Sequence, residues 1–126
     1  MKRVAMMVVC FLGAGCTSKP DAPLTAGGKP VSHWLSELKQ RDAKARCKAV
    51  KELGHVGKAD PAAIPAVIDA LKDADANVRA EAALALLNLG PHAADAAPAL
   101  AEAAKDRDPK VREYAVKALE KVRASS

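Results

Sequence analysis

The side chains with the most reactive chemistry in this sequence are three cysteines and three histidines. Cys10 and Cys16 lie near the N-terminus, and Cys47 is alone in the rest of the chain, where it has no partner for an intramolecular disulfide. We expect an unreactive thiol there, with an intermolecular disulfide as the alternative. The histidines lack i, i+4 spacing and metal-ligand neighbours, so we expect no metal centre. They are His33, His55 and His92.

Three aspartates recur at a constant spacing of 33 residues, at Asp42, Asp75 and Asp108. Carboxylates can act as general acids or bases, but each of these precedes an apolar pattern of helical spacing. An aspartate in that position caps the helix N-terminus and places negative charge at the positive end of its dipole. No serine lies in a nucleophile elbow. The sequence therefore predicts a protein that is not an enzyme and uses no cofactor.

The first sixteen residues have the three-part layout of an export signal. Lys2 and Arg3 are positively charged, and an unbroken apolar run follows over residues 4–12. This run has about half of the roughly 20 residues that a membrane-spanning helix needs, so it predicts no stable transmembrane anchor. Small residues then lead into Cys16. One interpretation is an ordinary secretory leader that is cut at a small residue.

The other interpretation rests on the stretch Leu12-Gly-Ala-Gly-Cys16, which resembles the lipobox of bacterial lipoproteins. That family prefers leucine three positions before the cysteine, whereas here Gly13 occupies that position. The resemblance implies a signal peptide over residues 1–15 and lipidation of Cys16. Several acyl chains would hold the exported protein on a membrane, facing the periplasm or the cell exterior. Residues 16–30 hold three prolines and two glycines, and they predict a flexible linker.

The rest of the chain repeats itself with a period of 33 residues, because several residue types align at that shift. The aligned sets are Arg46, Arg79 and Arg112; Ala49, Ala82 and Ala115; and Leu53, Leu86 and Leu119. Each unit predicts a first helix, starting near residue 31, 64 or 97, and a second helix that starts after the aspartate. Gly57 and Gly90 also align, and they predict helix ends with positive φ.

The chain has 126 residues, of which 50% are hydrophobic and 2% aromatic, so one modest domain with closely packed alanine-rich helices is expected. One hairpin cannot bury its own apolar face, so neighbouring hairpins must stack. We therefore predict an all-α fold, a short right-handed α-solenoid of about three hairpins over residues 31–57, 58–90 and 91–123, with residues 124–126 frayed. The net charge of +5, which would fall on removal of Lys2 and Arg3, is too mild to indicate nucleic-acid binding.

The stretch Asp75-Ala-Asn-Val-Arg79, the alanine- and leucine-rich segment after it and Gly90 resemble HEAT-like repeats, in the short bacterial variety also found in phycobilisome lyases. The resemblance covers residues 31–123. It implies a hydrogen-bonded ladder between successive repeats, formed by Asp42, Arg46, Asp75, Arg79, Asp108 and Arg112. It also leaves open a chromophore-lyase-like or enzyme-assisting subunit as an alternative function, with a bilin-like adduct at Cys47.

Positions of the second helices that point away from the apolar stripe line the concave surface in repeat proteins of this kind. The candidates for a partner-binding face are Lys44, Lys48, Lys51, Glu81, Lys110, Tyr114 and Lys117. Such a lysine excess predicts either a solvated face or a surface for an acidic protein segment or anionic headgroups. The expected function is a membrane-tethered scaffold or adaptor that binds another protein. The sequence leaves the partner and the oligomeric state open.

Overall fold

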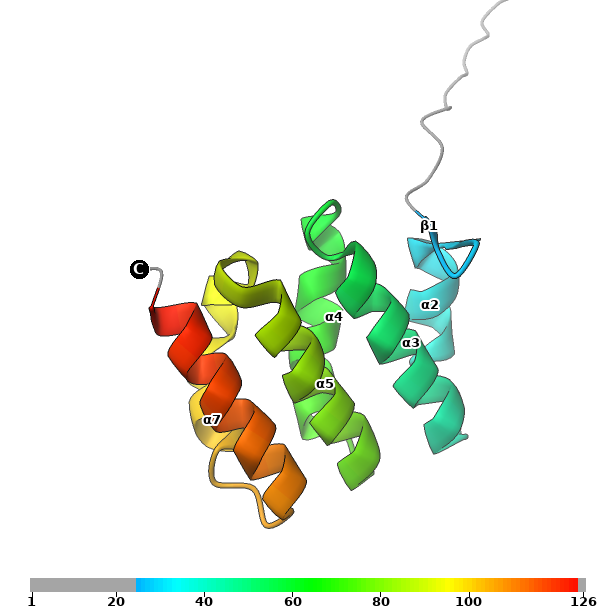
Figure 1. Ribbon diagram of the computed structural model, residues 1–126. Coiled ribbons are helices and arrows are strands. Elements are labelled where there is room, and N and C mark those ends of the chain that lie inside the picture. The colour runs from blue at the N-terminus through cyan, green and yellow to red at the C-terminus, as the bar shows by residue number, and fades with distance from the viewer. Residues whose placement is uncertain (1–24, 125–126) are drawn as a thin grey trace, which may run out of the picture.

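The computed structural model describes residues 25–124, which form a row of three helical hairpins (Figure 1). In each hairpin a short first helix is followed by a longer second helix that returns alongside it. This arrangement confirms the predicted all-α solenoid. Residues 1–24, which include Cys16, the predicted signal peptide and most of the predicted linker, lie outside the described part of the chain.

The long second helices are α3 (Ala43–Val56), α5 (Ala76–Leu89) and α7 (Pro109–Arg123). Each begins directly after one of the periodic aspartates, which confirms the predicted N-caps. In α5, one carboxylate oxygen of Asp75 accepts hydrogen bonds from the backbone N–H groups of Asn77 and Val78, at 2.8 and 3.3 Å. Asp108 caps α7 in the same way, and Asp42 caps α3 with one such bond, from the backbone N–H of Lys44. These bonds satisfy amides that the start of a helix leaves without partners.

The first helices are α2 (Val31–Glu37), α4 (Ile64–Asp69) and α6 (Ala97–Ala103). Two of them are extended by 3-10 turns: η2 (Pro61–Ala63) and η3 (Ala70–Lys72) flank α4, and η4 (Gly90–Ala96) precedes α6. Pro65 and Pro98 lie in the first turns of α4 and α6, where the missing N–H has no intrahelical acceptor.

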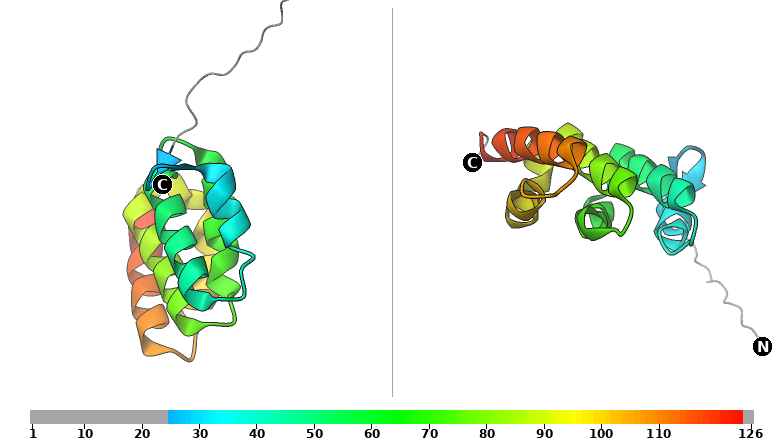
Figure 2. Two further views of the ribbon diagram at one scale, coloured as in Figure 1. Left: turned by 90° about the vertical axis from the view of Figure 1, so that its right-hand side faces the viewer. Right: turned by 90° about the horizontal axis from the view of Figure 1, so that it is seen from below.

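The helices form two layers, with α3, α5 and α7 in one and α2, α4 and α6 in the other (Figure 2). α5 packs directly between α3 and α7. The core lies between the layers, where Leu53, Leu86 and Leu100 are fully buried. Each such side chain contributes about 1.5–3 kcal/mol through its removal from water.

The two aligned glycines differ in what they provide. Gly90 ends α5 with a φ of +58°, as predicted, but Gly57 has a φ of −57°, so the prediction of a positive φ is wrong there. Gly57 is needed for space, because a Cβ at this position would lie 2.8 Å from Cδ2 of Leu89 and 3.4 Å from Cγ1 of Ile64. One register position therefore serves packing in the first repeat and backbone geometry in the second.

A small antiparallel hairpin precedes α2 and corrects the predicted flexible linker over residues 25–30. Its strands are β1 (Thr25–Ala26) and β2 (Lys29–Pro30), and β1 contacts α3. A Cβ at Gly27, in the turn, would lie 3.4 Å from Cζ2 of the buried Trp34. Two-residue strands are too short to leave a periodic pattern in the sequence, which is why the prediction missed them.

Candidate functional site

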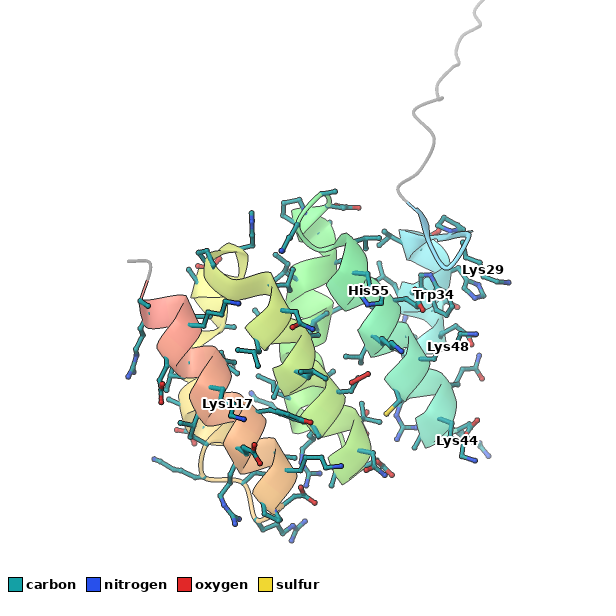
Figure 3. All side chains as sticks on the ribbon, in the orientation of Figure 1. Lys29, Trp34, Lys44, Lys48, His55 and Lys117 are labelled. Carbon is teal, nitrogen blue, oxygen red and sulfur yellow. The ribbon has the colours of Figure 1, made fainter. Side chains whose placement is uncertain are left out.

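The outer side of the second-helix layer carries four equivalent positions on each long helix. They are Lys44, Lys48, Lys51 and His55 on α3; Asn77, Glu81, Leu84 and Asn88 on α5; and Lys110, Tyr114, Lys117 and Lys121 on α7. Residues 33 apart lie side by side because the helices run in the same direction. We call this surface the second-helix face (Figure 3). It contains all seven residues that the sequence analysis selected as the candidate partner-binding face.

Charge on the second-helix face is unevenly distributed. The outer helices α3 and α7 each contribute three exposed lysines, whereas Glu81 is the only charged residue among the four positions of α5. Leu84 is half-buried in the middle of this weakly charged row of α5 positions. The face therefore has a partly apolar centre between two cationic borders.

A shallow groove lies between α3 and α5 on this face. It is lined by Lys51, Gly54, His55, Glu81, Leu84, Ala85 and Asn88, and its cavity volume is about 70 Å³. The helices approach closely here, because a Cβ at Gly54 would lie 2.7 Å from Cβ of Ala85. Pockets for small ligands usually have volumes of about 300–1,000 Å³. The groove has room for part of a side chain rather than for a chromophore.

The lysines of this face differ in their interactions. The Lys48 ammonium lies 5.7 Å from the centre of the Trp34 ring, a cation–π distance, and so leans toward α2. The Lys117 ammonium donates a hydrogen bond of 2.8 Å to Glu113, which raises the pKa of Lys117 and lowers that of Glu113. Within residues 25–124, the side chains of Lys44, Lys51 and Lys110 make no hydrogen bond or ion pair.

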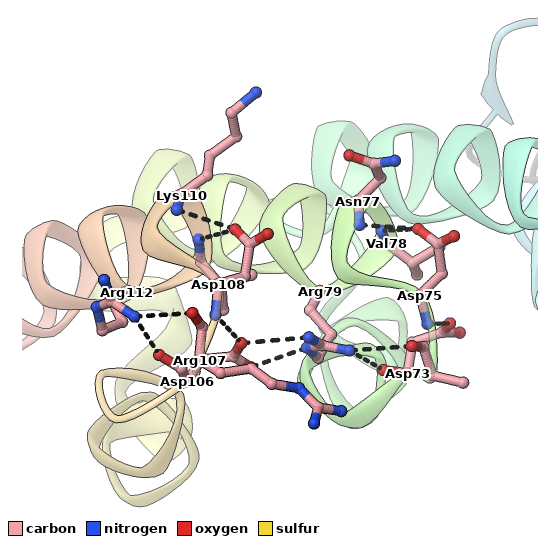
Figure 4. Close-up of polar contacts among 12 residues, drawn as sticks. Asp73, Asp75, Asn77, Val78, Arg79, Asp106, Arg107, Asp108, Lys110 and Arg112 are labelled. Atoms are coloured by element: carbon pink, nitrogen blue, oxygen red, sulfur yellow. Dashed lines mark hydrogen bonds and ion pairs between the residues drawn. The ribbon is translucent and has the colours of Figure 1, made fainter.

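A ladder of arginines and aspartates joins successive repeats along one end of the helices (Figure 4). Nε and Nη2 of Arg46 donate to the carboxylate of Asp73, at 2.9 and 3.0 Å. Arg79 makes the same paired contact with Asp106, at 2.8 and 3.2 Å. Such bidentate pairs fix geometry as well as adding stability.

This ladder corrects the pairing that the sequence resemblance implied. Its arginines are the expected ones, but the carboxylates of Asp42, Asp75 and Asp108 cap helices and accept no hydrogen bond from a guanidinium group. The ladder carboxylates come two residues before the caps, at Asp73 and Asp106. These positions also follow the 33-residue period, with a glutamine in the first repeat. This incomplete repetition could have identified the ladder aspartates in the sequence. The capping aspartates repeat in all three units, and the resemblance assigned the ladder to them.

The electrostatics of the ladder agree with its geometry. Burial acts to raise the pKa of Asp73, but hydrogen bonds from Arg46 and from the backbone N–H of Asp75 outweigh it, and the pKa lies below its ordinary value. The pKa of Asp106 is lowered for the same reasons, with Arg79 and Asp108 as the donors. Both carboxylates are therefore ionised at neutral pH.

The family model for HEAT repeats matches residues 31–120, which is most of the chain. The chain belongs to the HEAT-repeat family. No curated protein matches it. HEAT repeats commonly mediate protein–protein interactions, and the family generally provides non-catalytic scaffolds. The three hairpins are thus HEAT repeats, and the ladder fixes each repeat against the next.

The remaining reactive groups of these HEAT repeats form no second site. Cys47 is half-buried, and burial followed by the nearby charge of Glu81 raises the pKa of its thiol, which disfavours the reactive thiolate. Across residues 25–124, no three histidine, cysteine or acidic side chains are placed to hold a metal ion. In the same part of the chain, no helix has the length and apolar character needed to cross a bilayer.

Proposed function

We propose that this HEAT-repeat protein is a non-catalytic adaptor, exported and held on a membrane by a lipid on Cys16, which uses its second-helix face to bind an acidic segment of another protein. The observation that carries the binding proposal is the arrangement of charge on that face. Cationic borders on α3 and α7 flank the less charged α5, where Leu84 lies in a shallow groove.

An acidic amphipathic segment has matching chemistry. Its apolar side chains would lie along α5, and its carboxylates would lie near the lysines of α3 and α7. Lys44, Lys51 and Lys110 are the strongest candidates for this attraction, because no ion pair within residues 25–124 neutralises them. Charges at the edge of an interface act mainly on the association rate and on specificity.

The first experiment tests the face. Lys44, Lys51 and Lys110 are replaced together by Glu, and the matched control replaces Lys39, Lys72 and Lys105, which lie at or just beyond the ends of the first helices, by Glu. The probe is a synthetic helical peptide with one leucine stripe flanked by glutamates. We expect the first variant to bind at least about tenfold more weakly than wild type, a loss of about 1.4 kcal/mol, and the control to bind nearly as wild type.

Binding of wild type should also weaken as salt shortens the Debye length from about 10 Å at 0.1 M to about 3 Å at 1 M. Equal affinity of both variants, or affinity that does not depend on salt, would show that the lysines only solvate the helices.

The second experiment tests the tether. Cys16→Ala should abolish incorporation of labelled fatty acid and move the protein from the membrane fraction to the soluble fraction. A processed Cys16→Ala protein that stays in the membrane fraction would contradict the proposed anchor. Wild-type protein without label would favour the simple secretory leader.

A further inference from the structure

The ladder arginines have a two-part arrangement that repeats along the chain. Nη1 of Arg46 donates to the carbonyl oxygens of Gln40 and Arg41 in its own repeat, at 2.9 and 2.8 Å. Nη1 of Arg79 donates in the same way to the carbonyls of Asp73 and Ala74. These bonds hold the guanidinium so that Nε and Nη2 face the following repeat, whose aspartate they bind.

Arg112 has the first part of this arrangement and lacks the second. Its Nη1 donates to the carbonyl oxygens of Asp106 and Arg107, at 2.8 and 2.9 Å (Figure 4). Within residues 25–124, no carboxylate accepts from its Nε or Nη2. The guanidinium is therefore already oriented for a bidentate carboxylate, and the entropic cost of ordering this long side chain has already been met.

The surface beside Arg112 also matches an interface between repeats. Val116 is in register with Val50 and Ala83, which are 0% exposed because the next repeat covers them, whereas Val116 is 42% exposed. It is the only large hydrophobic side chain among the described residues that is exposed to this degree. Arg112 and Val116 line one open surface of α7, which we call the C-terminal face.

We propose that the C-terminal face of α7 is a docking site for a helical hairpin of a partner protein that carries an aspartate two residues before the N-cap of its second helix. The occupant is defined by the two internal interfaces. In both, the aspartate that binds arginine also accepts a hydrogen bond of 2.9 Å from the backbone N–H of the capping aspartate, as between Asp106 and Asp108. An Asp-x-Asp helix start thus fits the geometry that Arg112 presents.

A second copy of this chain is the poorer occupant. The residue of its first repeat that would meet Arg112 is Gln40, which is in register with Asp73 and Asp106. A neutral amide offers one oxygen and no charge, so it cannot form the bidentate ion pair. The aspartates of the second and third repeats are already bound to Arg46 and Arg79.

The charges around the C-terminal face allow one added carboxylate. Glu113 is neutralised by Lys117 at 2.8 Å, and its ion pair leaves the Arg112 charge available. Glu113 and Glu120 replace Ala80 and Leu87 of the internal interface, so the C-terminal face is more polar than its internal counterpart. This polarity suits a partner that associates and dissociates, because obligate interfaces are more apolar.

The experiment titrates the full chain with a synthetic peptide that has the sequence of residues 91–123, the third repeat, which contains Asp106. A covalent cross-link joins the two helices of the peptide, because one hairpin alone does not bury its apolar face, and circular dichroism verifies that the peptide is helical before the titration. The matched control peptide carries Asp106→Asn, which keeps the oxygen that accepts from Asp108 and removes only the charge. Calorimetry gives the affinities, and NMR signals of Val116 and Arg112 report the location. We expect binding of the aspartate peptide with shifts at both residues, and at least about tenfold weaker binding of the asparagine peptide.

Protein variants separate this site from the second-helix face. Arg112→Gln removes both the charge and the bidentate donors, so it should abolish the difference between the two peptides, while Arg107→Gln, at a residue whose side chain makes no hydrogen bond in the described structure, should preserve it. Lys51→Glu should leave the difference intact, even if it weakens binding at the other face. Absence of binding of the helical peptide, equal binding of both peptides, or a difference that survives in Arg112→Gln would overturn the proposal.

Discussion

Residues 33 apart on α5 and α7 point in the same direction along the row of repeats, toward the position that a following repeat would occupy. The two surfaces that they form nevertheless have opposite environments. On α5, Arg79 and Ala83 are buried by the third repeat. On α7, Arg112 and Val116 are exposed. Because the local backbone and the caps are similar, the difference comes mainly from the neighbouring repeat, which covers α5 and not α7. In a protein built of stacked repeats, the position of a residue within its repeat therefore determines which way its side chain points. The position of that repeat in the stack determines whether the side chain is buried.

Part of the difference between the two surfaces comes from their side chains. Glu113 and Glu120 of α7 occupy the register of Ala80 and Leu87 of α5, so the outer surface has gained charge where the inner one packs. Charged side chains at these positions suit a surface that faces water. Val116 and the carbonyl-bound Arg112 depart from that trend, which is why they support a docking site.

The largest expected contrast comes from placing a charge at the same register position on each helix. Ala83→Glu should lower the free energy of unfolding by about 3–5 kcal/mol, because it leaves an unpaired charge between packed helices. Val116→Glu should change it by no more than about 0.5 kcal/mol. Urea denaturation of the two variants measures both values. Similar losses would mean that α7 is covered as α5 is.

Removal of the ladder arginines should give a smaller contrast of the same kind. Arg79→Ala should cost about 1–3 kcal/mol, since it leaves the partly buried Asp106 carboxylate without its main partner. Arg112→Ala should cost less, because only hydrogen bonds to two exposed carbonyls are lost. Lys72→Ala, at an exposed site, is the reference and should be nearly neutral. Equal melting temperatures for the three variants would contradict a stabilising ladder.

The helix caps should show no such contrast, because capping is local. Asp75→Ala and Asp108→Ala each remove two backbone hydrogen bonds of similar length and should each cost about 0.5–2 kcal/mol. Thermal unfolding followed by circular dichroism compares them. A much larger loss for Asp75→Ala would indicate that the cap also holds the repeats together.

Acid should weaken the internal interfaces. The pKa values of Asp73 and Asp106 are lowered in the folded protein, so the stability that they contribute is complete above their unfolded pKa of about 3.9 and is lost as pH falls through their folded pKa. Melting temperatures measured from pH 5 to pH 2 should therefore fall, and Asp73→Asn should make the fall shallower. An unchanged slope in that variant would show that other carboxylates dominate acid unfolding.

The sequence by itself determined the three hairpins and the second-helix face. Both follow from short-range chemistry: a capping aspartate starts each long helix, and helical spacing selects the residues that point outward. The resemblance to HEAT-like repeats implied the role of Arg79 between repeats, but it implied the wrong aspartates as partners. Asp73 and Asp106 were missed because a side chain's reach across an interface depends on how the repeats stack, and the neighbouring capping aspartates follow the period more completely.

Tertiary structure decided whatever depends on which neighbour is present. It placed the residue 25–30 hairpin against α3, gave Gly57 a packing role in place of a turn, and brought Lys48 over Trp34. It also made Val116 an exposed side chain at a position that is buried in the two earlier repeats. The physical reason is that a side chain is buried only when a second surface covers it. A repeat pattern predicts which way a side chain points but not whether another surface covers it.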